Sequence, residues 1–386
     1  MWIVGHAQTS SPAATYDPLL STVRGNDVDH DHRIEMIDGV NGIDASWLTD
    51  ALAGTGWGVV AALDVSPVGT GQVADTVRLD ITWADEGSPD RPASLVAKVA
   101  AADPTSRQAA AFTRTYEVEA AFYADLADEL PVRTPACYHV DHDAAGNRYV
   151  VVLEDLAPAR QGDQLAGCTL EDARTCLVEL VQLHAPRWDD PTLEDLAWLH
   201  RYSDEAVAAM AGIITALAPG FLERYRNTLD PDVAALCGEL VPRLAAVFAD
   251  RPRPWTVAHG DFRLDNLLFG DGRVAVVDWQ TVAHGPGIAD LSYFLGAGFT
   301  IEDRRRHEHL LVEEYTLAMA AAGVVGLEVD AAWLAYRRFA FGGLIMAIVA
   351  SMLVGQTERG DAMFMTMANR HGRHALDLDS LSLVPS

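Results

Sequence analysis

Residues 259–266 read HGDFRLDN, and residues 267–279 after them read LLFGDGRVAVVDW. The apolar runs LLF and VAVV flank a Gly-Asp-Gly turn, which predicts a short β-hairpin. The second strand of this hairpin ends at Asp278. Because a hairpin returns the chain toward its start, we expect Asp278 and Asp261 to face one cleft.

The residue types in this stretch suit phosphoryl transfer. That reaction needs a carboxylate to orient and deprotonate the attacking hydroxyl, oxygen ligands for Mg²⁺, and a cation on the phosphates. Asp261 fits the role of the base. Asn266, five residues later, offers a carbonyl oxygen to the metal, and Asp278 offers a hard anionic ligand beside it. The stretch therefore predicts a catalytic loop with two metal ligands.

The composition indicates where the cation lies. Of the 28 basic residues only Lys98 is a lysine, and all the others are arginines. A general preference for arginine does not explain the single exception. Lysine differs from arginine where a compact, flexible point charge is needed in place of a planar fork. Strands predicted at 73–83 and 94–99, with a Gly-, Ser- and Pro-rich turn between them, place Lys98 in a β-hairpin.

A carboxylate on an apolar helix face offers a partner for Lys98. Residues 112–130 repeat apolar side chains at steps of three and four, which predicts a helix. Glu119 falls in the middle of the apolar stripe. Because an unpaired buried carboxylate is costly, we expect an ion pair between Glu119 and Lys98. The stripe consists of Phe112, Tyr116, Ala120, Tyr123, Ala127 and Leu130.

The pattern H-G-D-x-x-x-x-N, followed by a strand that ends in Asp, resembles the aminoglycoside phosphotransferase and choline kinase family. The triplets Gly69-Thr70-Gly71, Glu154-Asp155-Leu156 and Asp278-Trp279-Gln280 resemble its ecdysteroid-kinase-like branch. The motifs span residues 57–295. The resemblance implies a two-lobed α+β, protein-kinase-like fold, with an antiparallel β-sheet and a helix in the N-terminal lobe and a larger, mainly helical C-terminal lobe. It also implies ATP and Mg²⁺ between the lobes.

The resemblance gives each motif residue a role. Lys98 matches the strand lysine on the phosphates, and Glu119 matches its helix partner. Asp261 matches the catalytic base, and Asn266 with Asp278 match the metal ligands. Nucleotide contacts are also expected from Gly69, Thr70, Gly71, Glu154 and Leu156, and support of the catalytic loop is expected from His259 and Asp290.

We expect three segments along the chain: an N-terminal arm or early helices at 1–45, a nucleotide-binding lobe at 46–155, and a helical lobe at 156–386 that carries the catalytic loop and the acceptor site. An uncharged run, Phe339–Gly355, is nearly long enough to span a membrane, but we expect it to be a buried helix of this lobe. The helices predicted in this lobe cover 170–184, 203–217, 231–249, 303–322 and 330–355.

Charge and cysteine usage limit the partners. The chain has 55 acidic residues and a formal net charge of −27, which argues against a nonspecific nucleic-acid or anionic-membrane surface. A cationic or neutral hydroxylated small molecule is the expected acceptor, and its identity stays open among aminoglycosides, amino alcohols, sugars, sterol-like alcohols and hydroxy acids. The four cysteines form no C-x-x-C pair and no secretory signal opens the chain, so we expect a reduced, cytoplasmic protein.

Two other functions fit parts of the pattern. A pseudokinase would keep the fold and bind nucleotide without catalysis, but the base, both metal ligands and the lysine are all present here. A non-haem iron oxygenase could use His259, Asp261 and His284, but such sites usually lie in all-β barrels. The acid-and-His run at 27–32 is expected to be solvated, as are His371 and His374.

Overall fold

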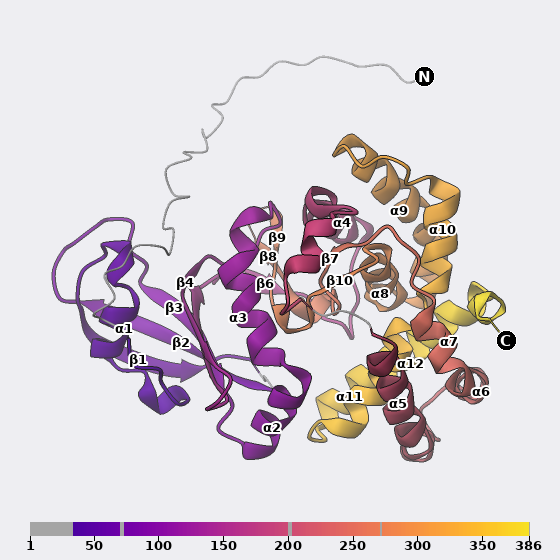
Figure 1. The fold of residues 1–386 in the computed structure, drawn as a ribbon, viewed down its shortest axis with the longest axis horizontal. Coiled ribbons are helices and arrows are strands. Elements are labelled where there is room, and N and C mark those ends of the chain that lie inside the picture. Colours follow the sequence, from indigo (N-terminus) through magenta and orange to yellow (C-terminus); the bar gives the residue numbers. More distant parts are fainter. Residues whose placement is uncertain (1–33, 70–72, 200–202, 271, 386) are drawn as a thin grey trace.

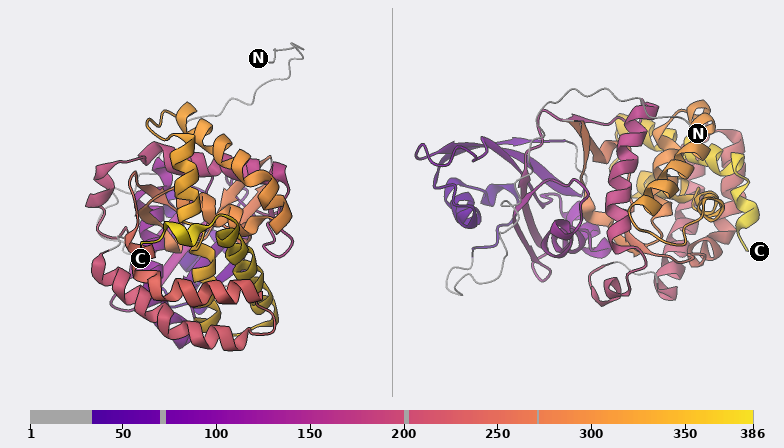
Figure 2. Two further views of the ribbon diagram at one scale, coloured as in Figure 1. Left: turned by 90° about the vertical axis from the view of Figure 1, so that its right-hand side faces the viewer. Right: turned by 90° about the horizontal axis from the view of Figure 1, so that it is seen from above.

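The computed structural model of the protein describes residues 34–69, 73–199, 203–270 and 272–385. The chain folds into two lobes. The smaller lobe, indigo to purple in Figure 1, holds a five-stranded sheet, and the larger lobe is mainly helical. Figure 2 shows the same two lobes from two further sides. The predicted two-lobed α+β fold is thus confirmed. The acid-and-His run at 27–32 lies outside the described residues.

The sheet of the smaller lobe is antiparallel, with the strand order β1-β2-β3-β5-β4. One face shares a core with α1 and the chain before it, where Ile37 and Leu48 pack with Leu79 and Val99. Ile37 therefore packs in this lobe although it precedes the predicted boundary at residue 45. The elements are α1 (Ala45–Ala51), β1 (Val60–Pro67), β2 (Ala74–Trp83), β3 (Ser94–Ala100), β4 (Cys137–Asp143) and β5 (Arg148–Glu154).

Two helices cover the other face of the sheet, where the sequence predicts one helix at 112–130. α2 (Pro104–Thr113) ends at Arg114, which has a left-handed conformation with φ 58°, and α3 (Thr115–Asp125) begins directly after it. Phe112 lies on α2 and is 78% exposed, so its prediction as a buried stripe residue is wrong. The other stripe residues are buried on α3 and in the chain that follows it.

Two small sheets frame the catalytic loop in the larger lobe. The predicted hairpin is confirmed: β8 (Leu267–Gly270) pairs with β9 (Arg273–Val276), and β6 (Arg160–Gln161) extends the sheet. β7 (Thr256–Ala258) ends just before His259 and pairs with β10 (Ala283–Gly285). Strands therefore hold the loop at both of its ends.

A bundle of helices surrounds α8, which is buried along almost its whole length and contacts α4, α9, α10, α11 and α12. The helices are α4 (Leu170–His184), α5 (Asp204–Arg224), α6 (Pro231–Leu240), α7 (Leu244–Ala249), α8 (Ile288–Gly298), α9 (Ile301–Ala321), α10 (Val329–Arg338), α11 (Gly342–Leu353) and α12 (Glu358–Asp377). Short 3-10 helices lie at Val40–Gly42, Ala53–Thr55, Ala127–Glu129, Ala185–Arg187, Pro191–Asp195, Val241–Arg243, Leu264–Asn266, Trp279–Thr281 and Ser380–Leu383.

Two of the helices predicted from the sequence are each divided into two helices. The predicted ranges also leave out α8 and α12. A 3-10 turn that contains Pro242 separates α6 from α7, because proline lacks the amide that a continuous helix would use. The helix predicted at 330–355 is divided into α10 and α11. His371 and His374 on α12 are 1% and 0% exposed, so their expected solvation is wrong.

Two helical stretches are long and apolar enough to cross a membrane when judged by length and composition alone. They cover 204–224, which is α5, and 329–353, which comprises α10 and α11. In the second stretch half of the apolar window is buried inside the protein, against 28% in the first. The second stretch includes most of the uncharged run that was expected to be a buried helix, and Leu344 and Ile348 in that run are fully buried.

Candidate active site

Lys98 and Glu119 form the ion pair that the sequence predicts. The Lys98 Nζ atom lies 2.6 Å and 2.7 Å from the two carboxylate oxygens of Glu119. β3 directs the lysine to the face of the sheet that α3 covers. Glu119 is only 1% exposed. The Tyr149 hydroxyl also donates a hydrogen bond to its Oε2 atom, at 2.7 Å. The buried carboxylate on α3 is therefore bonded by side chains from two strands of the sheet, Lys98 on β3 and Tyr149 on β5.

The same lysine reaches the end of the hairpin in the other lobe. Its Nζ atom lies 3.0 Å from Oδ1 of Asp278. Burial lowers the pKa of Lys98, but the negative charges of Asp278 and Glu119 outweigh this and raise the pKa above its ordinary value. Burial likewise raises the pKa of Asp278, and the charge of Lys98 outweighs it, so that pKa is lowered. Both groups stay charged at the junction between the lobes.

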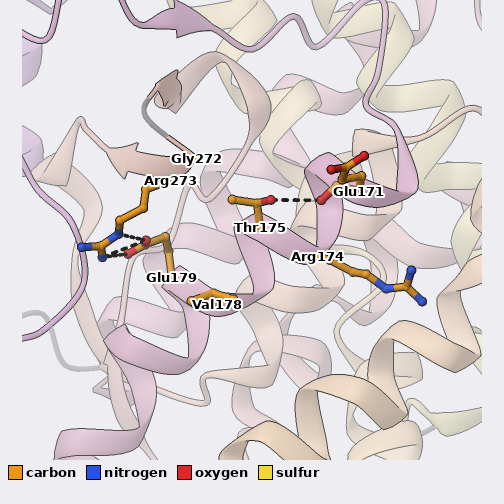
Figure 3. A pocket seen from close by; sticks show the side chains of 7 residues that line it. All are labelled: Glu171, Arg174, Thr175, Val178, Glu179, Gly272 and Arg273. Atoms are coloured by element: carbon orange, nitrogen blue, oxygen red, sulfur yellow. Dashed lines mark hydrogen bonds and ion pairs between the residues drawn. The ribbon is translucent and has the colours of Figure 1, made fainter. Parts of the chain in front are cut away.

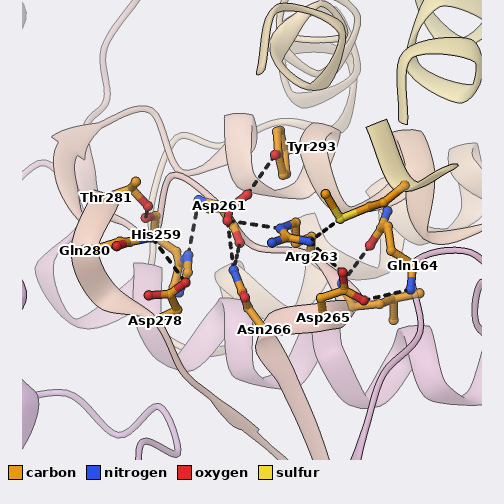
Figure 4. A network of polar contacts seen from close by, with 12 residues as sticks. Gln164, His259, Asp261, Arg263, Asp265, Asn266, Asp278, Gln280, Thr281 and Tyr293 are labelled. Carbon is orange, nitrogen blue, oxygen red and sulfur yellow. Dashed lines mark hydrogen bonds and ion pairs between the residues drawn. The ribbon is translucent and has the colours of Figure 1, made fainter. Parts of the chain in front are cut away.

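Three side chains fix the Asp261 carboxylate, as Figure 4 shows. The Tyr293 hydroxyl donates to Oδ1 at 2.7 Å. Asn266 Nδ2 and Arg263 Nε donate to Oδ2 at 2.9 Å and 3.1 Å. Asn266 also donates to the Asp261 carbonyl at 2.9 Å, and Arg263 bonds onward to Asp265 at 2.8 Å. Asp261, Asn266 and Arg263 thus form one hydrogen-bonded unit.

Asp290 braces the backbone of the catalytic loop. Its carboxylate accepts from the amides of His259 at 2.6 Å and Gly260 at 2.9 Å, and the His184 ring lies 3.2 Å away. Gly260 has φ 81°, and a Cβ atom there would lie 2.6 Å from the Thr281 carbonyl oxygen, so only glycine fits. The backbone before Asp261 is therefore fixed from α8.

His259 links the loop to the strand that carries Asp278. Its Nε2 atom lies 3.1 Å from the Val277 carbonyl oxygen, and its Nδ1 atom accepts from the Asp261 amide at 3.2 Å. These partners require the tautomer with hydrogen on Nε2. Asp278 follows directly, with a left-handed φ of 70° that turns the chain at the end of the hairpin.

The predicted nucleotide contacts outside this cluster lie at the edges of the smaller lobe. Gly69 is exposed after β1 with φ 72°, while Thr70 and Gly71 lie outside the described residues. The Glu154 carboxylate accepts from Arg133 at 2.6 Å, and the Leu156 carbonyl accepts from the Ala159 amide at 2.8 Å. The roles of these residues toward a nucleotide stay predictions.

Three residues of this region were not singled out from the sequence, and a fourth, Asp155, was quoted there only as part of a motif. Arg263 lies within residues 259–266. Its position two residues after Asp261 could have identified it as a partner of that carboxylate. Tyr149 and Tyr293 read as ordinary core residues, and only the fold shows which carboxylate each one touches. Asp155 ties the connection between the lobes to the sheet, because it accepts from Arg78 Nη2 at 3.1 Å and from the Ser94 hydroxyl at 2.7 Å.

The oxygen ligands suit Mg²⁺, and the ring nitrogens of His259 are not available to iron. Because the nitrogen of the Asn266 amide bonds to Asp261, its oxygen is the atom left for a metal, and Asp278 supplies a carboxylate. Mg²⁺ commonly takes one or two protein ligands and completes its shell with water and phosphate oxygens. An iron site at His259, Asp261 and His284 would have to break the backbone bonds that both ring nitrogens of His259 make.

A separate pocket of about 280 Å³ lies between α4 and the β8–β9 hairpin (Figure 3). Arg273 on β9 reaches Glu179 on α4 at 3.0 Å. Glu179 also accepts from the Arg133 amide at 2.8 Å. None of the predicted site residues lines this pocket, and its ion pair holds the hairpin against the helix.

Comparison with known proteins places the chain among kinase-like proteins. The ecdysteroid kinase-like family matches residues 71–323, a span that contains the Lys98 pair and the catalytic loop. A mouse protein, acyl-CoA dehydrogenase family member 10, is 28% identical over 127 residues, which are 29% of this chain and 12% of the mouse protein. The chain thus spans only a small part of that relative.

Solved structures share the fold at low sequence identity. A Ralstonia eutropha protein assigned to the aminoglycoside phosphotransferases has a TM-score of 0.52 and 14% identity, with 89% of this chain and 98% of that chain covered. Choline kinase from Cryptosporidium parvum has a TM-score of 0.54 and 11% identity, with 82% and 89% covered. Because the family match takes in well over half of the sequence, including the catalytic loop, the chain belongs to the ecdysteroid kinase-like family.

Proposed function

We propose that this protein transfers the γ-phosphoryl group of ATP to a hydroxyl group of a small molecule, in the presence of Mg²⁺ and with Asp261 as the base. One observation carries the proposal. Lys98 reaches both the buried Glu119 of its own lobe and Asp278 of the other lobe, next to the loop that fixes Asp261. A cation, a metal-binding carboxylate and a base therefore meet at one junction, which is the set of groups that phosphoryl transfer needs.

In this mechanism the chain mainly positions and neutralises the reactants. Asp261 takes the proton of the acceptor hydroxyl as the acceptor oxygen bonds to the γ-phosphorus and the bond to the bridging β-phosphate oxygen breaks, which releases ADP. Lys98 holds phosphate oxygens, and Asn266 with Asp278 would hold Mg²⁺. The bound ion would neutralise charge on the phosphates. Asn266 and Arg263 keep the base in place.

A small acceptor is favoured over a protein. Asp290 follows Asp278 by only 12 positions, and a 3-10 turn, β10 and the start of α8 fill that interval, so no long activation segment lies between them. The likeness to choline kinase and to an aminoglycoside phosphotransferase supports a small hydroxylated acceptor in the helical lobe. The cytoplasm is the proposed location, because the four cysteines are free thiols.

The test is ATP consumption with Mg²⁺ across hydroxylated metabolites, sterols and aminoglycosides. Asp261→Ala should abolish turnover and leave Mg·ATP binding, measured as a thermal shift, largely intact. Asp64→Ala, which removes an exposed carboxylate on β1, is the control and should behave as the wild type. A fully active Asp261→Ala protein would contradict the proposal. Mg·ATP binding without turnover in the wild type would favour the pseudokinase instead.

A further inference from the structure

The hydrogen bonds of Asp261 leave little room for an acceptor hydroxyl. Each oxygen of a carboxylate offers about two lone-pair sites. On Oδ2 both are taken, by Asn266 Nδ2 at 2.9 Å and Arg263 Nε at 3.1 Å. On Oδ1 one is taken, by the Tyr293 hydroxyl at 2.7 Å. One site on Oδ1 is therefore left for a proton from the acceptor.

Tyr293 is a firm donor at this position. Burial, and then the negative charge of Asp261, raise the pKa of Tyr293 well above its ordinary range, so its hydroxyl keeps the proton that it donates. Its ring packs against the His371 ring, with 5.3 Å between centroids. It lies on α8 one turn after Asp290, which braces the same loop. α8 thus fixes Asp261 in two ways: Asp290 holds the backbone amides that precede it, and Tyr293 holds its carboxylate.

A glycine adjoins the ring of Tyr293. Gly342, the first residue of α11, is exposed, and a Cβ atom there would have only Tyr293 Cδ2 within 4 Å, at 3.5 Å. A residue without a side chain therefore lies beside the Cδ2 atom of the Tyr293 ring. The Oδ2 side is closed by Arg263, whose Nη1 atom reaches Asp265 at 2.8 Å and the Met363 sulfur at 3.3 Å.

We propose that the acceptor hydroxyl binds at Oδ1 of Asp261 and passes its proton to that atom, with Tyr293 as the positioning residue that aims Oδ1 at the acceptor. The inference rests on the proposed function and names the atom that takes the proton. As the proton moves to Oδ1, the acceptor oxygen bonds to the γ-phosphorus and ADP departs. Oδ2 keeps both of its donors through this step, so the carboxylate does not need to rotate.

The experiment compares Tyr293→Phe with Tyr336→Phe. Tyr336 is also a buried tyrosine of the helical lobe that donates to a carboxylate, Glu308, at 3.0 Å. ATP consumption with Mg²⁺ is measured with water alone and with the alcohol panel, and Mg·ATP binding is measured by thermal shift. Because the bond orients the base, Tyr293→Phe should lower kcat about 10- to 100-fold with the KM for ATP unchanged. Tyr336→Phe should leave both constants near those of the wild type.

Each other outcome is decisive. A Tyr293→Phe enzyme with wild-type kcat would overturn the assignment of Oδ1, because an acceptor at Oδ2 would displace Arg263 and would not depend on Tyr293. A fall in kcat matched by weaker Mg·ATP binding, or by an equal fall in Tyr336→Phe, would show a merely structural role and overturn it as well. A wild-type protein that consumes no ATP would overturn the proposed function, and this inference with it.

Discussion

At the scale of single residues, the position of Lys98 explains why one lysine occurs among so many arginines. An ammonium group has three donors, and three carboxylate oxygens surround this one, two from Glu119 and one from Asp278. A planar guanidinium could not point at a helix and at the opposite lobe from the same strand position. The composition therefore identified a residue whose geometry permits no exchange for arginine.

Removing Lys98 should expose the cost of the buried Glu119 charge. Glu119 is 1% exposed, so Lys98→Met leaves a carboxylate with Tyr149 as its remaining side-chain donor. The free energy of unfolding should fall by about 3–5 kcal/mol. The double variant Lys98→Met/Glu119→Leu should recover much of that loss, because it removes the stranded charge. Urea unfolding of the wild type, both single variants and the double variant measures the coupling. Additive losses would contradict a paired charge.

The pH dependence of this contribution follows from the two pKa shifts. The pKa of Lys98 is raised, so its stabilisation is complete below the unfolded value of about 10.4 and is lost as pH rises through the folded value. The pKa of Asp278 is lowered, so its stabilisation is complete above about 3.9 and is lost as pH falls. The difference in unfolding free energy between wild type and Lys98→Met should therefore stay constant from about pH 6 to about pH 9. A drift above about 1 kcal/mol in that range would mean that another group titrates with the pair.

Sequence patterns found Lys98 and the carboxylates of the site but not Arg263 or the tyrosines. Lys98 was identified as the single lysine and Glu119 as a carboxylate on an apolar helix face. Asp261 was identified by its position in the H-G-D-x-x-x-x-N motif. Tyr149 and Tyr293 fit an apolar pattern equally well with or without their hydroxyl bonds. Their function depends on which carboxylate the fold brings to them, and a linear pattern does not contain that contact.

At the scale of elements, helix boundaries were predicted correctly where residues next to the helix end mark it in the sequence. α4 spans the predicted residues because Thr169 caps it and Asp172 completes a capping box. The break at Arg114 has no such signal, since a left-handed conformation is uncommon for any residue except glycine. His371 and His374 were expected on a solvated helix face because they are polar, but the face of α12 that carries them is buried.

The close packing of Gly296 against His371 predicts the effect of a substitution on stability. A Cβ atom on Gly296 of α8 would lie 2.3 Å from His371 Nδ1, which is closer than any real contact. Gly296→Ala should therefore cost about 1–3 kcal/mol of unfolding free energy, because the buried ring must shift. Gly212→Ala on α5 is the matched control: nothing lies within 4 Å of its Cβ position, so the change should stabilise by up to about 1 kcal/mol. Thermal and urea unfolding of both variants compare them, and equal effects would show that His371 is not tightly packed between these helices.

At the scale of the whole molecule, the two lobes are joined by one aromatic stack as well as by the Lys98–Asp278 pair. Phe122 on α3 lies parallel to Trp279, with 4.0 Å between ring centroids and 9° between planes. Both side chains are 0% exposed. Trp279 directly follows Asp278, so this contact between the lobes also sets the position of the proposed metal ligand. Binding of nucleotide and rigidity of the junction should therefore depend on the same residues.

Trp279→Ala tests this coupling. The cavity should lower the free energy of unfolding by about 3–5 kcal/mol, and the lobes should then unfold in separate transitions followed by far-UV circular dichroism and by tryptophan fluorescence. Trp333→Ala, a change on α10 within the helical lobe, should also destabilise the protein but leave one coincident transition. If the stack is the coupling element, Mg·ATP should draw the two transitions of Trp279→Ala together again, because a ligand that needs both lobes stabilises only the joined state. One coincident transition in both variants would instead assign the coupling to the polar contacts between the lobes, among them the Lys98–Asp278 pair and the bond from the Arg133 amide to Glu179.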